Sequence, residues 1–140
     1  MGPPLKQLTK SQDPALKGRV KLVFKHFPLG FHKQAMNAAK ASIAAHRQGK
    51  FWEMHDVIFK NIKTLANGVY EGYAKEIGLN IAKFKKDFAD PATEAEVKQD
   101  MAEARAAGLG GTPTVYINGR KYQGGYSEQQ IGGIVKKYLK

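Results

Sequence analysis

A long stretch of helical periodicity between two short strand patterns constrains the fold of this sequence more than any other feature. From Gln34 to about Gly108, apolar residues recur every three to four positions, which predicts five consecutive amphipathic helices. Before this stretch, residues 19–27 alternate between apolar and mostly basic side chains, which is typical of a strand. After it, Asn118-Gly119 lies between two short β-rich segments and predicts a hairpin, because both positions tolerate positive φ.

Local signals predict where the helices begin and end. Residues 1–10 favour one or two helical turns, and Ser127 followed by Gln130 predicts a capping box at the start of the last helix. Asn80 is a candidate N-cap for the fourth helix. Asp90-Pro91 is expected to end that helix, and a fifth helix is expected to begin at Ala92 or Thr93. We expect the acidic side chains of that helix to form a solvated face: Glu94, Glu96, Asp100 and Glu103.

The composition is that of one globular domain. The chain has 140 residues, of which 42% are hydrophobic and 25% charged, and this composition excludes a wholly disordered protein. It has no apolar run of about 18 residues, so no membrane-spanning helix is expected. No secretory signal is found at Met1–Lys6. The absence of cysteine excludes disulfides, thiolate metal sites and a cysteine nucleophile in this sequence.

The basic charge is concentrated at the front of the chain. The formal net charge is +11, and residues 1–50 contain ten lysines and arginines against one acid, Asp13. This asymmetry keeps a nucleic-acid or anionic-surface binder as an alternative function. Nucleic acid is disfavoured as a partner, because the basic residues form no long run and no nucleic-acid-binding motif accompanies them.

The residues alone indicate no enzyme, cofactor or metal site. The four histidines lack the spacing of a metal site, and His55 falls on an apolar helix face, where a core histidine with one hydrogen-bond partner is expected. His32 is expected in a loop or cap. The glycine-rich segment 109–113 precedes a strand rather than a helix, which argues against a phosphate loop. Periodicity therefore predicts one α/β or α+β domain.

Four strings of the sequence resemble, in order, the thioredoxin-fold oxidoreductases of the bacterial disulfide-bond (DsbA-like) family. They extend over nearly the whole chain: Val20–Leu29 (VKLVFKHFPL), Gln34–Ala39 (QAMNAA), Gln48–Asp56 (QGKFWEMHD) and Gly110–Gly119 (GGTPTVYING). The resemblance implies that residues 1–140 form one DsbA-like domain. Within it, residues 19–28 and 112–140 would be the thioredoxin-like part, residues 1–10 a remnant of the active-site helix, and residues 33–108 a helical insertion.

The resemblance also implies a peptide-binding loop at Gly111, Thr112 and Pro113. In that family the peptide bond before the proline is cis, and the backbone of the preceding residue pairs with an extended substrate. X-Pro bonds are the ones that adopt the cis form at low cost. We therefore expect a cis bond between Thr112 and Pro113, with an extended peptide or unfolded protein as the partner.

The sequence departs from the family because it lacks the Cys-x-x-Cys motif. By the resemblance, the first strand and both cysteines would lie upstream of residue 1, so this chain is predicted to be inactive in thiol–disulfide exchange, which requires a thiolate. Two readings follow, an oxidoreductase represented by a truncated chain and a redox-dead peptide-binding or chaperone-like module. The family is usually extracytoplasmic, whereas this sequence contains no export signal.

The missing first strand would lie in the middle of the sheet. Without it, the strand at residues 19–28 and the first strand of the hairpin would each have an unpaired edge. We expect the gap to be closed in one of two ways. The flanking strands pair directly, or a second copy of the chain fills it and forms a homodimer.

Overall fold

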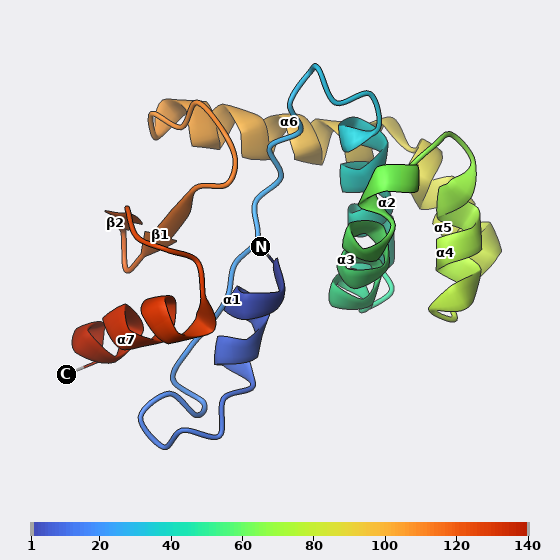
Figure 1. The fold of residues 1–140 in the computed structure, drawn as a ribbon. Helices are drawn as coiled ribbons and strands as arrows, with labels where there is room; N and C mark the ends of the chain where they lie inside the picture. Colours follow the sequence, from blue (N-terminus) through green and yellow to red (C-terminus); the bar gives the residue numbers. More distant parts are fainter. Residues whose placement is uncertain (1, 140) are drawn as a thin grey trace. The chain divides into compact units, whose positions relative to one another are not determined.

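The computed structural model describes residues 2–139, and the chain divides into two compact units (Figure 1). The discontinuous unit consists of Met1–Phe24 and Gly111–Lys140, so it is built from the two ends of the chain. The helical unit is Lys25–Gly110. No helix among residues 2–139 is both long and apolar enough to cross a membrane.

The helical unit contains the five helices that the periodicity predicts. They are joined by short turns, with one 3₁₀ turn at Ile62–Thr64: α2 (Ala35–His46), α3 (Phe51–Lys60), α4 (Val69–Glu76), α5 (Ile81–Ala89) and α6 (Pro91–Ala106). Asn80 caps α5 as predicted, since its side chain accepts a hydrogen bond from the Lys83 N–H at 2.9 Å. Helix α6 begins earlier than predicted. Pro91 occupies its first turn, where no N–H is needed, and Asp90 accepts from the Ala92 N–H at 2.8 Å.

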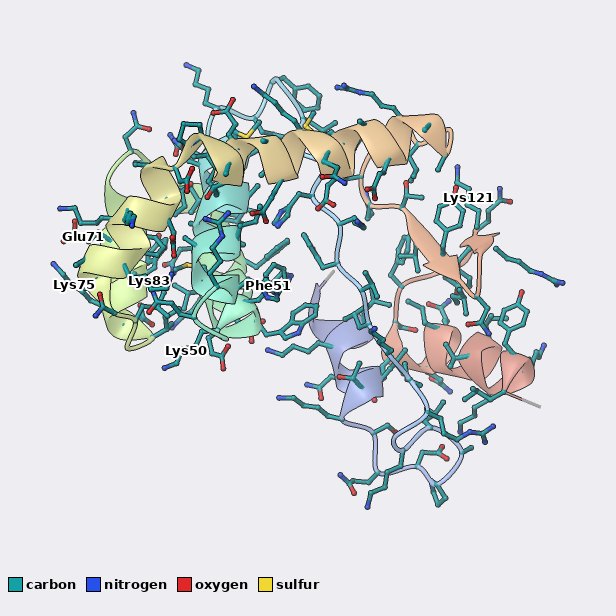
Figure 2. All side chains as sticks on the ribbon, turned by 180° about the vertical axis from the view of Figure 1, so that it is seen from behind. Lys50, Phe51, Glu71, Lys75, Lys83 and Lys121 are labelled. Carbon is teal, nitrogen blue, oxygen red and sulfur yellow. The ribbon has the colours of Figure 1, made fainter. Side chains whose placement is uncertain are left out.

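Ion pairs link neighbouring turns of α4 and of α5, where Figure 2 labels Glu71, Lys75 and Lys83. Glu71 and Lys75 on α4 lie 2.9 Å apart, and Lys83 and Asp87 on α5 lie 2.6 Å apart, both at a spacing of four residues. The expectation of a solvated acidic face on α6 is wrong for Asp100, whose side chain is 17% exposed. Asp100 bonds Lys25 at 3.0 Å and accepts the His26 N–H at 2.9 Å, so it fixes the segment before α2.

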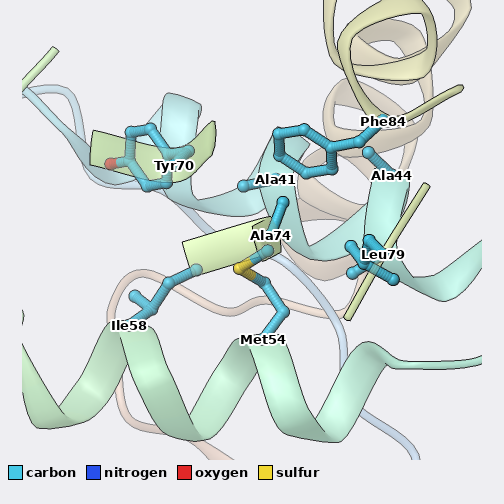
Figure 3. Packing of buried hydrophobic residues seen from close by; sticks show 9 residues of the cluster. Ala41, Ala44, Met54, Ile58, Tyr70, Ala74, Leu79 and Phe84 are labelled. Atoms are coloured by element: carbon cyan, nitrogen blue, oxygen red, sulfur yellow. The ribbon is translucent and has the colours of Figure 1, made fainter. Parts of the chain in front are cut away.

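Small and large apolar side chains interlock in the core of this unit (Figure 3). Ala41 and Ala44 of α2 and Ala74 of α4 are fully buried, which lets the helices approach closely. Met54 and Ile58 of α3 point toward Ala74 in the same view. This packing gives short helices, which are marginal in isolation, most of their stability.

Two histidines are buried in the helical unit. His55 is 3% exposed and its Nδ1 lies 3.1 Å from the Asp56 carboxylate, which confirms the predicted core histidine. His26 is 8% exposed and its ring meets the Phe51 ring edge-on at 6.0 Å. Burial lowers the pKa of His26 to about 4, although the carboxylates of Asp100 and Glu96 act in the opposite direction. The sequence did not indicate that His26 would be buried.

The discontinuous unit combines two helices with a two-stranded sheet. Its elements are α1 (Gly2–Thr9), β1 (Val115–Ile117), β2 (Arg120–Tyr122) and α7 (Glu128–Tyr138). Strands β1 and β2 are antiparallel, and positive φ at Asn118 and Gly119 confirms the predicted hairpin turn. The predicted capping box of Ser127 and Gln130 is present at α7. Leu8 of α1 packs in one core with Ile131 and Val135 of α7.

The predicted strand at residues 19–28 does not form. No strand is assigned there, and the sheet of the described residues contains only β1 and β2. The expectation that the flanking strands pair directly is therefore wrong. The alternation persists only over the first residues, since Val20 and Leu22 are half buried while Lys21 and Val23 are exposed. It ends at Phe24, which is exposed. The segment has the amphipathic pattern of a strand but lacks a neighbouring strand to accept its hydrogen bonds.

The core packing predicts the cost of truncating Met54. Met54→Ala should lower the free energy of unfolding by about 2–5 kcal/mol, because it leaves a cavity among fully buried side chains. The volume-conserving control Met54→Leu should cost less than about 1.5 kcal/mol. Denaturant unfolding followed by far-UV circular dichroism measures both. Equal and small losses for the two variants would show that this core is not close-packed.

Burial of His26 predicts a loss of stability in acid. Between pH 6.5 and 4 the unfolded chain holds a proton on this histidine and the folded chain does not, so the free energy of unfolding falls as the pH falls. The full shift corresponds to roughly 3 kcal/mol. His26→Phe should flatten this part of the stability curve, measured by urea titrations across the range. An equally steep curve in the variant would assign the acid loss to other groups.

Candidate functional site

The loop Gly111–Pro113 lies directly before β1 in the discontinuous unit. The Thr112–Pro113 bond is cis, as predicted. Thr114 Oγ donates a hydrogen bond to the Gly111 carbonyl at 2.8 Å, and the Tyr126 hydroxyl donates to the Pro113 carbonyl at 3.5 Å. The loop is therefore held from two sides, by the residue that leads into β1 and by a tyrosine just before α7.

Thr112 is a residue of this loop that is exposed and has no main-chain hydrogen bond within residues 2–139. Thr112 and Pro113 are exposed, whereas Gly111 and Thr114 are half buried. Within residues 2–139, no hydrogen bond involves the main chain of Thr112. An exposed N–H and C=O on a fixed loop can pair with the main chain of an extended peptide.

The sequence did not indicate the tyrosines that support the loop. Tyr122 of β2 and Tyr126 form an edge-to-face pair with ring centroids 6.1 Å apart, and the Tyr122 hydroxyl donates to the Gly125 carbonyl at 2.8 Å. The available signal was the pair of tyrosines at positions 122 and 126, one in the return strand and one just before the last helix. Their contacts with the loop depend on how the hairpin and α7 pack, which periodicity does not describe.

The helix at the front of the chain forms as predicted, but it carries no thiol. Helix α1 packs on α7 through Leu8, and the chain contains no cysteine. Its assignment as a remnant of an active-site helix stays a prediction. In the described part of the chain, no three histidine or acidic side chains gather in a way that could hold a metal ion.

The helical unit has a separate cavity of about 320 Å³ near the start of α2. Phe27, Met36 and Met101 supply its apolar lining, and Lys33 and Arg105 add positive charge. His32 also lines it and is exposed in the turn before α2, in agreement with the predicted loop position. The Arg105 guanidinium lies 5.9 Å from the centre of the Phe27 ring, so Phe27 already has a cationic partner.

Comparison with known proteins agrees with this fold. A family model described as thioredoxin matches residues 8–137. A crystal structure of a thioredoxin-like oxidoreductase from Silicibacter pomeroyi DSS-3 is similar, with a TM-score of 0.65 and 22% identity. The match covers 97% of this chain and 79% of that one. At this identity, the likeness shows the fold alone.

Similarity in sequence extends to parts of much longer proteins. The Na(+)/H(+) antiporter NhaA 1 of Salinispora arenicola (strain CNS-205) is 33% identical over 117 residues, which are 83% of this chain and 18% of the antiporter. The Na(+)/H(+) antiporter NhaA of Herminiimonas arsenicoxydans is 34% identical over 117 residues, 84% of this chain and 18% of that protein. This chain thus spans less than a fifth of the length of these relatives. Because the thioredoxin model matches almost the entire chain, the protein belongs to the thioredoxin family and has a thioredoxin-like fold.

Proposed function

We propose that this domain binds extended polypeptide segments at the loop Gly111–Pro113 and does not itself carry out thiol–disulfide exchange. The observation that carries the proposal is that Thr112 is an exposed residue whose main chain has no hydrogen bond within residues 2–139. A fixed loop of this kind binds an extended chain through main-chain hydrogen bonds, which do not depend on the partner's side chains. The expected partners are therefore unfolded or extended segments of varied sequence.

The chemistry of the chain supports binding rather than exchange. Thiol–disulfide exchange begins with attack by a thiolate, and none of the 140 residues is a cysteine. In an oxidoreductase of this family that carries a Cys-x-x-Cys motif, the same loop would hold the substrate beside the reactive thiols. The proposed activity is thus the substrate-binding half of an oxidoreductase.

The curated relatives support a role as one module of a larger protein. They are named as antiporters, and this chain aligns with less than a fifth of each. We propose that the domain contributes polypeptide binding within such an assembly. The division into residues 19–28 with 112–140 as the thioredoxin-like part and 33–108 as an insertion is part of the same proposal.

The proposal predicts that binding depends on the Thr112 amide and not on its side chain. Thr112→Pro removes the N–H donor and should weaken binding of a labelled, cysteine-free peptide of alternating serine and valine by about tenfold. Thr112→Ala keeps the donor and should bind within about twofold of the wild type. Fluorescence polarisation measures the affinities, and thermal unfolding checks that each variant is folded.

Two outcomes would contradict the proposal. The first is a wild-type chain that binds no extended peptide. The second is a folded Thr112→Pro variant that binds as tightly as Thr112→Ala, because the loop amide would then have no part in recognition.

A further inference from the structure

The cavity of about 320 Å³ in the helical unit has no part in the proposed function. It lies between the segment that leads into α2 and the side chains of Met36 on α2 and of Met101 and Arg105 on α6. All of its lining residues belong to the unit Lys25–Gly110. Sites for small molecules in proteins have volumes of about 300–1,000 Å³, so this cavity is large enough for a small ligand.

The apolar part of the lining is suited to an aromatic ring. Met36 and Met101 are half buried and pack against a small buried cluster where α2 meets α6. Phe27, also half buried, adds an aromatic face to the lining. Methionine side chains adapt their shape to a ligand, and their sulfur atoms make favourable contacts with aromatic rings. Two methionines and a phenylalanine around one cavity therefore favour a flat, apolar ring as its occupant.

The charged part of the lining is entirely basic. Lys33 and Arg105 line the cavity, and no acidic side chain does. Among residues 2–139, neither of these two cations forms an ion pair. Asp100 and Glu103, the acids of α6 nearest to Arg105 in sequence, pair instead with Lys25, at 3.0 and 2.9 Å. The contact of Arg105 with the Phe27 ring leaves its N–H donors for hydrogen bonds. The lining therefore favours an anion.

The walls of the cavity are held in place by hydrogen bonds of the chain itself. The His32 N–H donates to the Leu29 carbonyl at 3.0 Å, and the Ala35 N–H donates to the His32 carbonyl at 2.9 Å. Asp100 holds the start of the same segment through the His26 N–H. The opposite wall is helix α6. Since both walls are fixed, a ligand does not have to order them, and this lowers the cost of binding.

We propose that this cavity binds a small aromatic carboxylic acid in its ionised form. The ring lies among Phe27, Met36 and Met101, and the carboxylate accepts hydrogen bonds from Arg105 and Lys33. The guanidinium of arginine presents parallel N–H donors that match the two oxygens of a carboxylate. A single ring with a short acid-bearing chain suits this volume. The residues of the Gly111–Pro113 loop do not line the cavity, so the two binding activities can be lost separately.

The test uses the full 140-residue chain with isotope-labelled methionine methyl groups, observed by nuclear magnetic resonance. Met36 and Met101 line the cavity, whereas Met54 lies in the main core of the same unit and is the internal control. The probe 3-phenylpropionate should shift the methyl signals of Met36 and Met101 with a dissociation constant of about 1 mM or lower and leave Met54 unchanged. The neutral probe 3-phenylpropanamide should bind about tenfold more weakly, because it lacks the charge.

Substitution of Arg105 tests the assignment of the carboxylate. Arg105→Gln should weaken binding of 3-phenylpropionate by about tenfold and leave binding of the amide within about twofold. Lys63→Gln is the matched control, because Lys63 is an exposed cation of the same unit that does not line the cavity. It changes the net charge by the same amount and should leave both affinities within about twofold. Thermal unfolding checks that each variant is folded.

Several outcomes would overturn the proposal. They are the absence of a saturable shift at about 20 mM 3-phenylpropionate, equal affinities for the acid and the amide, and equal losses for Arg105→Gln and Lys63→Gln. A serine–glycine peptide that ends in phenylalanine with a free carboxylate should bind no more tightly than 3-phenylpropionate. If it binds about tenfold more tightly, the cavity is a site for the C-terminus of a partner protein and the proposal of a small acid fails. A folded Thr112→Pro variant should bind 3-phenylpropionate unchanged, and a loss there would place the acid at the loop instead.

Discussion

A strand needs hydrogen-bonding neighbours, and the sheet of the described residues contains only β1 and β2. The other features of the discontinuous unit depend on this constraint. Residues 19–23 keep the side-chain alternation of a strand, although no strand forms there. The core beneath them, around Leu8 and Ile131, is left with a groove. The unit is held by the packing of α1 on α7 and by a hairpin whose turn residues are suited to it.

The helical unit is under no comparable constraint, because a helix satisfies its backbone hydrogen bonds within itself. Its five helices need only bury their apolar faces, and they do so around Met54, Ala74 and Phe84. The ion pair of Asp100 with Lys25, its hydrogen bond from the His26 N–H and the burial of His26 then fix the segment that leads into α2. One chain therefore combines a core of five helices with a second core, around Leu8 and Ile131, that is built from both ends of the chain.

This contrast explains what could be predicted from the sequence. Local signals were sufficient for the turn at Asn118-Gly119, the capping box at Ser127 and the five helices, because the interactions that fix them lie within a few residues. The strand at 19–28 could not be judged in this way, because its existence depends on a partner distant in sequence. The early start of α6 was missed because Asp90-Pro91 can end one helix and also begin the next.

At the candidate site, too, some features could be predicted from the sequence and others depend on contacts that only the fold brings together. The cis bond at Thr112–Pro113 was expected from the family resemblance, and the structure contains it. The support from Tyr126 was not predicted, because it depends on a contact with Pro113 that forms only when the segment before α7 folds back onto the loop before β1. Charge was visible in the sequence, but its concentration on one unit required the fold.

The central claim is that, in the described part of the chain, residues 19–22 do not form a strand despite their strand-like sequence pattern. Amide hydrogen exchange, resolved by residue with nuclear magnetic resonance, tests this most directly. The account predicts that the amides of residues 20–22 exchange orders of magnitude faster than those in the middle of α2 and α3, which open only with the helical core. Protection of residues 20–22 equal to that of α3 would show a paired strand and contradict the account.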